Sequence, residues 1–174
     1  MVACNHIIWY TFVVVCNHKE VTIMESCSVF GHREIKITIE LKNRIYATFE
    51  DLIRKGCTRF YFGGFGTFDN LCHEIISDLK IKYSNVQRIF CLSDVRHLRT
   101  SKRPSWLKDE DYENFIYWDL DFDWWYQRIY YRNCATIDHS DIVVFYIEER
   151  ENSGAYKAFK YAQKKKKEII NLKD

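Results

Sequence analysis

The feature that most constrains this chain is an alternation of short apolar runs with longer stretches of helical periodicity, beginning near residue 25. Short apolar runs predict β-strands, and apolar residues recurring every three or four positions predict amphipathic helices. When strands and helices alternate, each helix carries the chain back so that the next strand runs parallel to the last. We therefore expect an α/β fold, a Rossmann-like three-layer sandwich with a mostly parallel sheet. The expected strands are 26–30, 58–62, 86–92, 114–118, 142–147 and 168–172, and the expected helices are 38–55, 68–80, 123–138 and 154–166.

A length of 174 residues predicts a single domain, which we place at residues 24–174. Residues 1–23 form an N-terminal extension, either an added strand or translated sequence upstream of a true start at Met24. Its apolar run, 7–15, is too short to cross a bilayer, which takes about 20 residues. Cys-Asn-His occurs twice in this extension, at 4–6 and 16–18, but the spacing matches no familiar zinc module, so we expect no metal.

Charge and cysteine content set the expectations for partners and compartment. The formal net charge is only +2, and the basic run 164–167 falls at the end of an expected helix, where cations complement the helix dipole. We therefore expect no nucleic-acid partner and no membrane partner. The seven cysteines are scattered through apolar stretches, which argues against a disulfide framework and favours the cytoplasm.

The strongest local signal is a glycine-rich turn that joins an expected strand to an expected helix. Gly63, Gly64 and Gly66 open the backbone, and Thr67 and Asp69 stand at the helix start. Missing side chains let an anion approach the main-chain amides, and the helix N-terminus attracts negative charge. The turn therefore predicts a phosphate site, in which Thr67 could donate its hydroxyl and Asp69 could cap the helix or accept from a sugar hydroxyl. The alternative is a tight turn without a ligand.

Other candidate residues also follow expected strands, and ligands of open α/β sheets bind beyond the carboxyl ends of the strands at a topological switch point. Arginine offers a fork for phosphate, and histidine a donor or a stacking face. Tyr156 could stack on a base or pack in the core, and residues 124–126 could be stacking rings but are favoured as core or dimer contacts. The full set of expected ligand-binding residues is Gly31, His32, Arg33, Gly63, Gly64, Phe65, Gly66, Thr67, Asp69, Arg132, Asn133, Gly154, Ala155 and Tyr156.

Four segments together resemble the SLOG superfamily, which takes in the DNA-processing protein DprA and the lonely-guy phosphoribohydrolases. They are 28–33, 62–69, 132–141 and 154–157, and the resemblance covers residues 25–172. It is nearest to the small single-domain bacterial and phage branch. The resemblance implies a Rossmann-like fold, a pocket lined by the Gly-His-Arg loop and the glycine turn, and a homo-oligomer, dimer or tetramer.

The same resemblance implies a nucleotide-derived ligand, of the ADP-ribose or cyclic-ADP-ribose type. The protein would be a sensor of such a signal or, if phage-encoded, an anti-phage-defence sponge that sequesters it in the host cytoplasm. The alternative is a nucleoside 5′-monophosphate phosphoribohydrolase. Against it, Asn70 stands where those enzymes carry a catalytic Glu, and an amide cannot act as a general base. We therefore expect no catalytic residue, or Asp69 if the protein is an enzyme, and no cofactor.

Overall fold

The computed structural model describes residues 25–118, 124–148 and 153–173. Its centre is a six-stranded sheet in the order β4-β3-β2-β1-β5-β6, and every neighbouring pair of strands is parallel. The strands are β1 (Ser26–Gly31), β2 (Arg59–Phe62), β3 (Gln87–Leu92), β4 (Asn114–Tyr117), β5 (Ile142–Tyr146) and β6 (Glu168–Asn171). The expected α/β Rossmann-like sandwich is confirmed.

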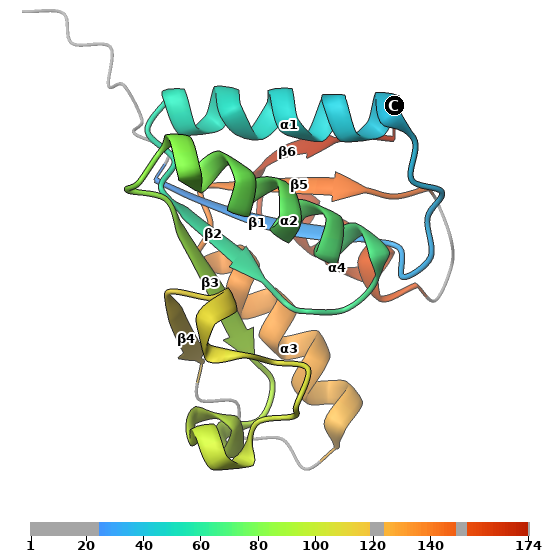
Figure 1. Ribbon diagram of the computed structural model, residues 1–174. Coiled ribbons are helices and arrows are strands. Elements are labelled where there is room, and N and C mark those ends of the chain that lie inside the picture. The colour runs from blue at the N-terminus through green and yellow to red at the C-terminus, as the bar shows by residue number, and fades with distance from the viewer. Residues whose placement is uncertain (1–24, 119–123, 149–152, 174) are drawn as a thin grey trace, which may run out of the picture.

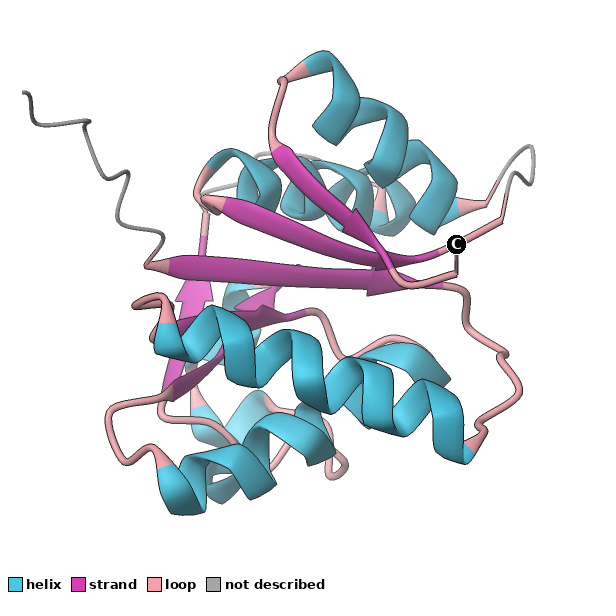
Figure 2. Ribbon diagram, turned by 90° about the horizontal axis from the view of Figure 1, so that it is seen from above, coloured by secondary structure: helices cyan, strands magenta, loops and turns pink. Residues whose placement is uncertain are grey.

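Four helices cover the two faces of the sheet, as the edge-on view in Figure 2 shows. Helices α1 and α2 pack on one face and α3 and α4 on the other (Figure 1). Each expected element is present, and its ends differ by a residue or two from the expectation. The helices are α1 (Ile39–Arg54), α2 (Thr67–Lys82), α3 (Trp125–Asp138) and α4 (Gly154–Lys164), and the loop before β4 carries three 3₁₀ turns.

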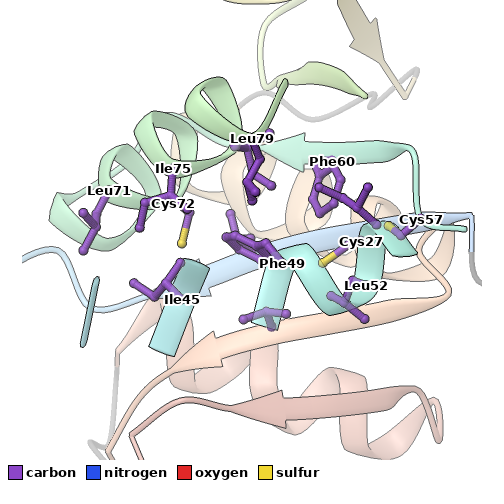
Figure 3. Close-up of a cluster of buried hydrophobic side chains, with 14 of the residues drawn as sticks. Cys27, Ile45, Phe49, Leu52, Cys57, Phe60, Leu71, Cys72, Ile75 and Leu79 are labelled. Carbon is purple, nitrogen blue, oxygen red and sulfur yellow. The ribbon is translucent and has the colours of Figure 1, made fainter. Parts of the chain in front are cut away.

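The larger core lies between the sheet and helices α1 and α2. Phe49 of α1 and Phe60 of β2 are fully buried there and meet edge to face, with ring centroids 5.6 Å apart. Figure 3 shows these rings with Leu79 of α2 and with Cys27 and Cys57. All five described cysteines are buried and free, so they act as small apolar side chains.

The beginnings of β1 and β5 are tied together by Asp141. Its Oδ2 accepts hydrogen bonds from the backbone amides of Glu25 and Ser26 and from the Ser26 hydroxyl, at 3.0, 3.0 and 2.7 Å. Asp141 therefore has a structural role. The bond network fixes the register in which Cys27 lies beside Ile142.

Several expectations fall on residues outside the described part. The N-terminal extension, both Cys-Asn-His segments and the side chain of Trp125 are among them. Within the described part, no helix combines the length and apolarity that crossing a bilayer requires. The same part holds no cluster of three metal-ligating side chains.

Candidate functional site

A cavity of about 490 Å³ opens at the carboxyl end of β1, beside the turn after β2 and the start of α4, the helix that follows β5. The chain adds β2, β3 and β4 on one side of β1 and then returns to place β5 on the other side. The gap between β1 and β5 is therefore the topological switch point, where open parallel sheets bind ligands. The cavity walls come from the end of β1, the turn after β2, one face of α3 and the start of α4.

Arg132 of α3 is the most unusual residue of this wall, because it is a charged side chain only 3% exposed. Its Nη1 donates to the carbonyl oxygens of Cys91 and Gly63 at 2.6 and 3.2 Å, and its Nε donates to Oδ1 of Asn133 at 2.9 Å. Burial lowers the pKa of Arg132, but arginine stays protonated in proteins. The cavity is therefore bordered by a rigidly held positive charge.

One nitrogen of that guanidinium remains without a partner. Among the described residues, Arg132 Nη2 has no hydrogen-bond acceptor, and the only fully enclosed side-chain oxygen or nitrogen without a partner is Ser28 Oγ. Nη2 is therefore not fully enclosed by protein atoms. It remains available to an anion that enters the cavity, since a guanidinium binds phosphate or carboxylate oxygens with charge-assisted hydrogen bonds.

The N-terminus of α4 forms the opposite wall. Ser153 caps the helix by accepting from the Tyr156 amide at 3.2 Å, and Gly154 and Ala155 border the cavity. A Cβ built on Gly154 would meet no heavy atom within 4 Å, so this glycine leaves open space above the helix start. The unpaired amides of a first helical turn and the positive end of the helix dipole favour an anion here.

The glycine turn is arranged differently from the expectation. Asp69 is buried, and its carboxylate accepts from the amides of Gly63 at 3.1 Å and Gly64 at 2.8 Å. The prediction that these two amides receive a phosphate is therefore wrong in this structure, because the chain's own carboxylate occupies them. Burial raises the pKa of Asp69 to about 6, although both hydrogen bonds and the charge of Arg132 oppose this rise.

Thr67 is likewise occupied. Its amide and its hydroxyl both donate to the carbonyl oxygen of Arg33, at 2.7 and 2.8 Å, so the predicted phosphate contact from Thr67 is also wrong. Gly66 has φ of +101°, and a Cβ there would lie 2.6 Å from Cα of Arg33. The glycines thus permit the loop after β1 to pass close over the turn after β2. At Thr67 and Gly66 the structure therefore matches the alternative prediction, a tight turn whose groups bind the protein itself.

His32 joins the loops that follow β1 and β5. The Glu148 amide donates to His32 Nε2 at 3.0 Å, so a neutral ring carries its proton on Nδ1, which lies 3.4 Å from Ser153 Oγ. Because Ser153 also caps α4, His32 helps to position that helix at the cavity. Its ring borders the cavity, as expected, but its nitrogens serve the protein.

The aromatic residues considered for the site fall into two places. Phe65 borders the cavity, and the guanidinium carbon of Arg132 lies 5.6 Å from the centre of its ring. Tyr156 does not border the cavity but lines an adjoining groove between α3 and α4, together with Asn133 and Gly154. Trp124 and Tyr126 are exposed, at 64% and 56%, so neither is a core residue. The other half of the favoured interpretation, a dimer contact, stays a prediction for both.

Most of the expected site residues meet around the one cavity. Gly64, Gly66 and Thr67 do not border it, because they turn toward Phe90 and Arg33. Ile129 stands one helical turn before Arg132 and Asn133 and could have been inferred from them. The cavity-lining residues that the expected set lacks are Val29, Phe30, Glu34, Ile129 and Ser153. The expected residues that do border the cavity are Gly31, His32, Arg33, Gly63, Phe65, Asp69, Arg132, Asn133, Gly154 and Ala155.

Comparison with solved structures finds similar folds at low sequence identity. DprA from Streptococcus pneumoniae superposes with a TM-score of 0.57 at 12% identity, covering 86% of this chain and 50% of that one. DprA from Helicobacter pylori, whose structure addresses its single-stranded DNA binding mode, gives 0.54 at 16% identity, covering 86% and 65%. The protein TM1055 gives 0.54 at 17% identity, covering 84% and 73%.

The chain has a Rossmann-like fold similar to the folds of DprA and TM1055. It spans about half the length of the DprA from S. pneumoniae. No protein-family model matches the sequence, and no curated protein matches it. The expected likeness to DprA is therefore confirmed for the fold alone.

The same comparison corrects the expectation that nucleic acid is not a partner. A DprA with this fold is described by its single-stranded DNA binding mode, so a DprA-like fold with a net charge of only +2 gives no ground for excluding nucleic acid. The expectation was wrong because it used the net charge, which averages over the whole surface. Nucleic acid binds to local clusters of cations, which a low net charge does not exclude.

Proposed function

We propose that the protein binds a nucleotide-derived small molecule, of the ADP-ribose or cyclic-ADP-ribose type, in the cavity between β1 and β5. The observation that carries the proposal is Arg132, a buried guanidinium whose Nη2 has no acceptor among the described residues. A buried charge is costly to desolvate, and a bound phosphate would add a second negative group to the Asp69 carboxylate, whose charge already interacts with Arg132. The start of α4 borders the same cavity and offers amide donors to that phosphate.

The rest of the cavity offers groups that suit the other parts of a nucleotide. Asp69 is an acceptor at the cavity wall, which suits a ribose hydroxyl and disfavours a phosphate directly beside it. Phe65 offers an exposed ring face on which a base could stack. The volume of about 490 Å³ lies within the range of small-molecule sites, about 300–1,000 Å³.

We favour binding without turnover, as in a sensor or a sponge. Asn70 is exposed, so the position of the hydrolases' catalytic carboxylate does not border the cavity here. The Asp69 carboxylate is held by two backbone amides, which fixes its geometry. Whether the bound molecule is sensed or sequestered depends on the cell in which the protein acts. A phage-encoded protein would act as a sponge, which sequesters the molecule.

The second candidate is an N-glycosidase that cuts a nucleoside 5′-monophosphate. One observation favours it, namely a buried carboxyl at the cavity whose pKa is raised to about 6. Carboxyl groups with pKa values near neutrality serve as general acids or bases. Asp69 is the only residue to which we assign this role.

Thermal unfolding with added ligands tests the proposal. ADP-ribose or AMP at about 100 times its dissociation constant should add about 2.7 kcal/mol to the free energy of unfolding. Gly154→Leu should remove that effect and retain the fold, because the new side chain meets no protein atom at its base and enters the open space. Chromatography of the recovered nucleotide should show it intact. Steady release of free base, abolished by Asp69→Asn, would favour the glycosidase, and no thermal shift with any nucleotide would contradict both candidates.

A further inference from the structure

A second concave surface lies beside the cavity, a groove of about 940 Å³ between α3 and α4. Ile129, Asn133 and Gly154 line both the groove and the cavity, so the two spaces meet at these residues. Gly154 is the first residue of α4, and the groove continues from there along that helix. A ligand with a phosphate at the start of α4 can therefore extend out of the cavity into the groove.

The groove is lined mainly by hydrogen-bond donors. Its described lining residues include five tyrosines and three lysines, and none of them is acidic. The cavity, by contrast, is lined by the two carboxylates of Glu34 and Asp69. Lysine ammonium groups and tyrosine hydroxyls both donate hydrogen bonds to phosphate oxygens. The groove therefore offers a phosphate more donors and less repulsion than the carboxylate side of the cavity does.

Two of the lysines, Lys157 and Lys160, stand at the end of the groove nearest the cavity. They follow Gly154 by three and six residues, which places them about 4.5 and 9 Å from it along the axis of α4. Lys160 leans toward the cavity end of the helix, since its Nζ lies 5.3 Å from the centre of the Tyr156 ring. Lys165 pairs with an aspartate at 2.9 Å, whereas neither of these two lysines forms an ion pair with a described residue.

We propose that this end of the groove binds the second phosphate of a nucleoside diphosphate ligand, through Lys157 and Lys160, while the first phosphate lies in the cavity. The assignment rests on the proposed function, because it concerns the same ligand. The two phosphates of a diphosphate share one bridging oxygen, so a lysine one turn along α4 reaches the second when the first lies at the helix start. A group attached to the second phosphate, such as the distal ribose of ADP-ribose, then lies among the tyrosines. The ligand class is a nucleoside diphosphate or its conjugate, rather than a nucleoside monophosphate.

Titration calorimetry with AMP, ADP and ADP-ribose tests the assignment. Wild-type protein should bind ADP and ADP-ribose at least about tenfold more tightly than AMP, because one hydrogen bond between charged groups contributes about that factor. Equal affinities for AMP and ADP would overturn the second-phosphate site and leave the cavity proposal standing. If none of the three ligands binds, both proposals are wrong.

Charge variants locate the contact. The double variant Lys157→Gln, Lys160→Gln should lower the affinity for ADP to that for AMP, and it should leave the affinity for AMP unchanged because AMP has no second phosphate. The matched control replaces Lys42 and Lys102, which are exposed and outside the groove, by glutamine and should bind all three ligands like wild type. Thermal unfolding without ligand verifies that both variants fold. A preference for ADP that survives in the Lys157, Lys160 variant would place the second phosphate elsewhere and overturn the assignment.

Two further measurements test other occupants of the groove. Inorganic pyrophosphate should bind more weakly than ADP, because it lacks the nucleoside that the cavity holds. Equal affinities for pyrophosphate and ADP would mean that the groove takes a free anion, which would overturn the assignment. Sedimentation of the wild type and of the Lys157, Lys160 variant without ligand should give equal masses. A mass that changes in the variant would place a second copy of the chain on the groove and would also overturn it.

Discussion

The carboxylate of Asp69 accepts a hydrogen bond of 2.8 Å from the Gly64 amide, so a side chain of the protein itself occupies a donor that a glycine-rich turn commonly offers to phosphate. The same carboxylate also accepts from the Gly63 amide. The turn therefore holds an internal anion. A phosphate that enters the cavity finds its free donors elsewhere, at Arg132 and at the start of α4.

Burial of Asp69 makes stability depend on pH in an unusual direction. Its pKa is raised to about 6 in the folded protein, whereas an aspartate in an unfolded chain has a pKa of about 3.9. The folded state therefore binds more protons between these values. The Asp69 contribution to the free energy of unfolding is fully present below about pH 4 and is lost as the pH rises through about 6, by about 3 kcal/mol in total.

Urea unfolding of wild type and Asp69→Asn across pH 4–7.5 measures this contribution. The asparagine variant cannot titrate, so the wild-type free energy minus the variant free energy should fall as the pH rises. Other titrating groups cancel in that difference. A difference that is flat, or that grows with pH, would show that Asp69 ionises at least as easily in the folded protein as in the unfolded chain.

Gly66 should tolerate no side chain, whereas Gly154 should accept one. Gly66→Ala places a Cβ at φ of +101° and 2.6 Å from Cα of Arg33, so we expect it to lower the free energy of unfolding by about 2 kcal/mol or more. Gly154→Ala meets open space at a helix start and should raise it by about 0.5 kcal/mol. Thermal unfolding of both variants decides, and equal effects would contradict this account of the turn.

Ser28→Ala should stabilise the protein. The Ser28 hydroxyl is fully buried in β1 without a hydrogen-bond partner, and an unpaired buried polar group costs about 1–3 kcal/mol. The matched control is Ser140→Ala, since Ser140 is equally buried but donates to the Thr136 carbonyl at 2.7 Å. We expect the control to be neutral or destabilising in chemical denaturation. A Ser28→Ala variant less stable than Ser140→Ala would mean that the Ser28 hydroxyl does have a partner.

The fold could be predicted from the sequence because each strand and helix is indicated by a short, continuous stretch of residues. The unbroken apolar run of β5 and the periodic apolar positions of α1 each follow from a short stretch of residues, and alternation then implies a parallel sheet. The general place of the site was also predictable, since the rule for open parallel sheets selects the loops after β1, β2 and β5.

The occupancy of individual donors was not predictable. Glycines at 63, 64 and 66 indicate a backbone that admits a close neighbour, but the sequence does not distinguish a ligand from the protein's own Arg33 loop and Asp69. The groove was missed for a related reason. The lysines of α4 and the tyrosines of α3 are distant in the sequence, and only the packing of the two helices places them on one surface.

The most direct test of the central claim is a crystal structure of the protein with ADP-ribose. We predict density in the cavity, with a phosphate oxygen about 2.7–3.2 Å from Arg132 Nη2 or from the amides of Gly154 and Ala155, and with Asp69 still bound to Gly63 and Gly64. A cavity left empty at millimolar ligand, or a phosphate seated on the Gly63 and Gly64 amides with Asp69 displaced, would contradict the account.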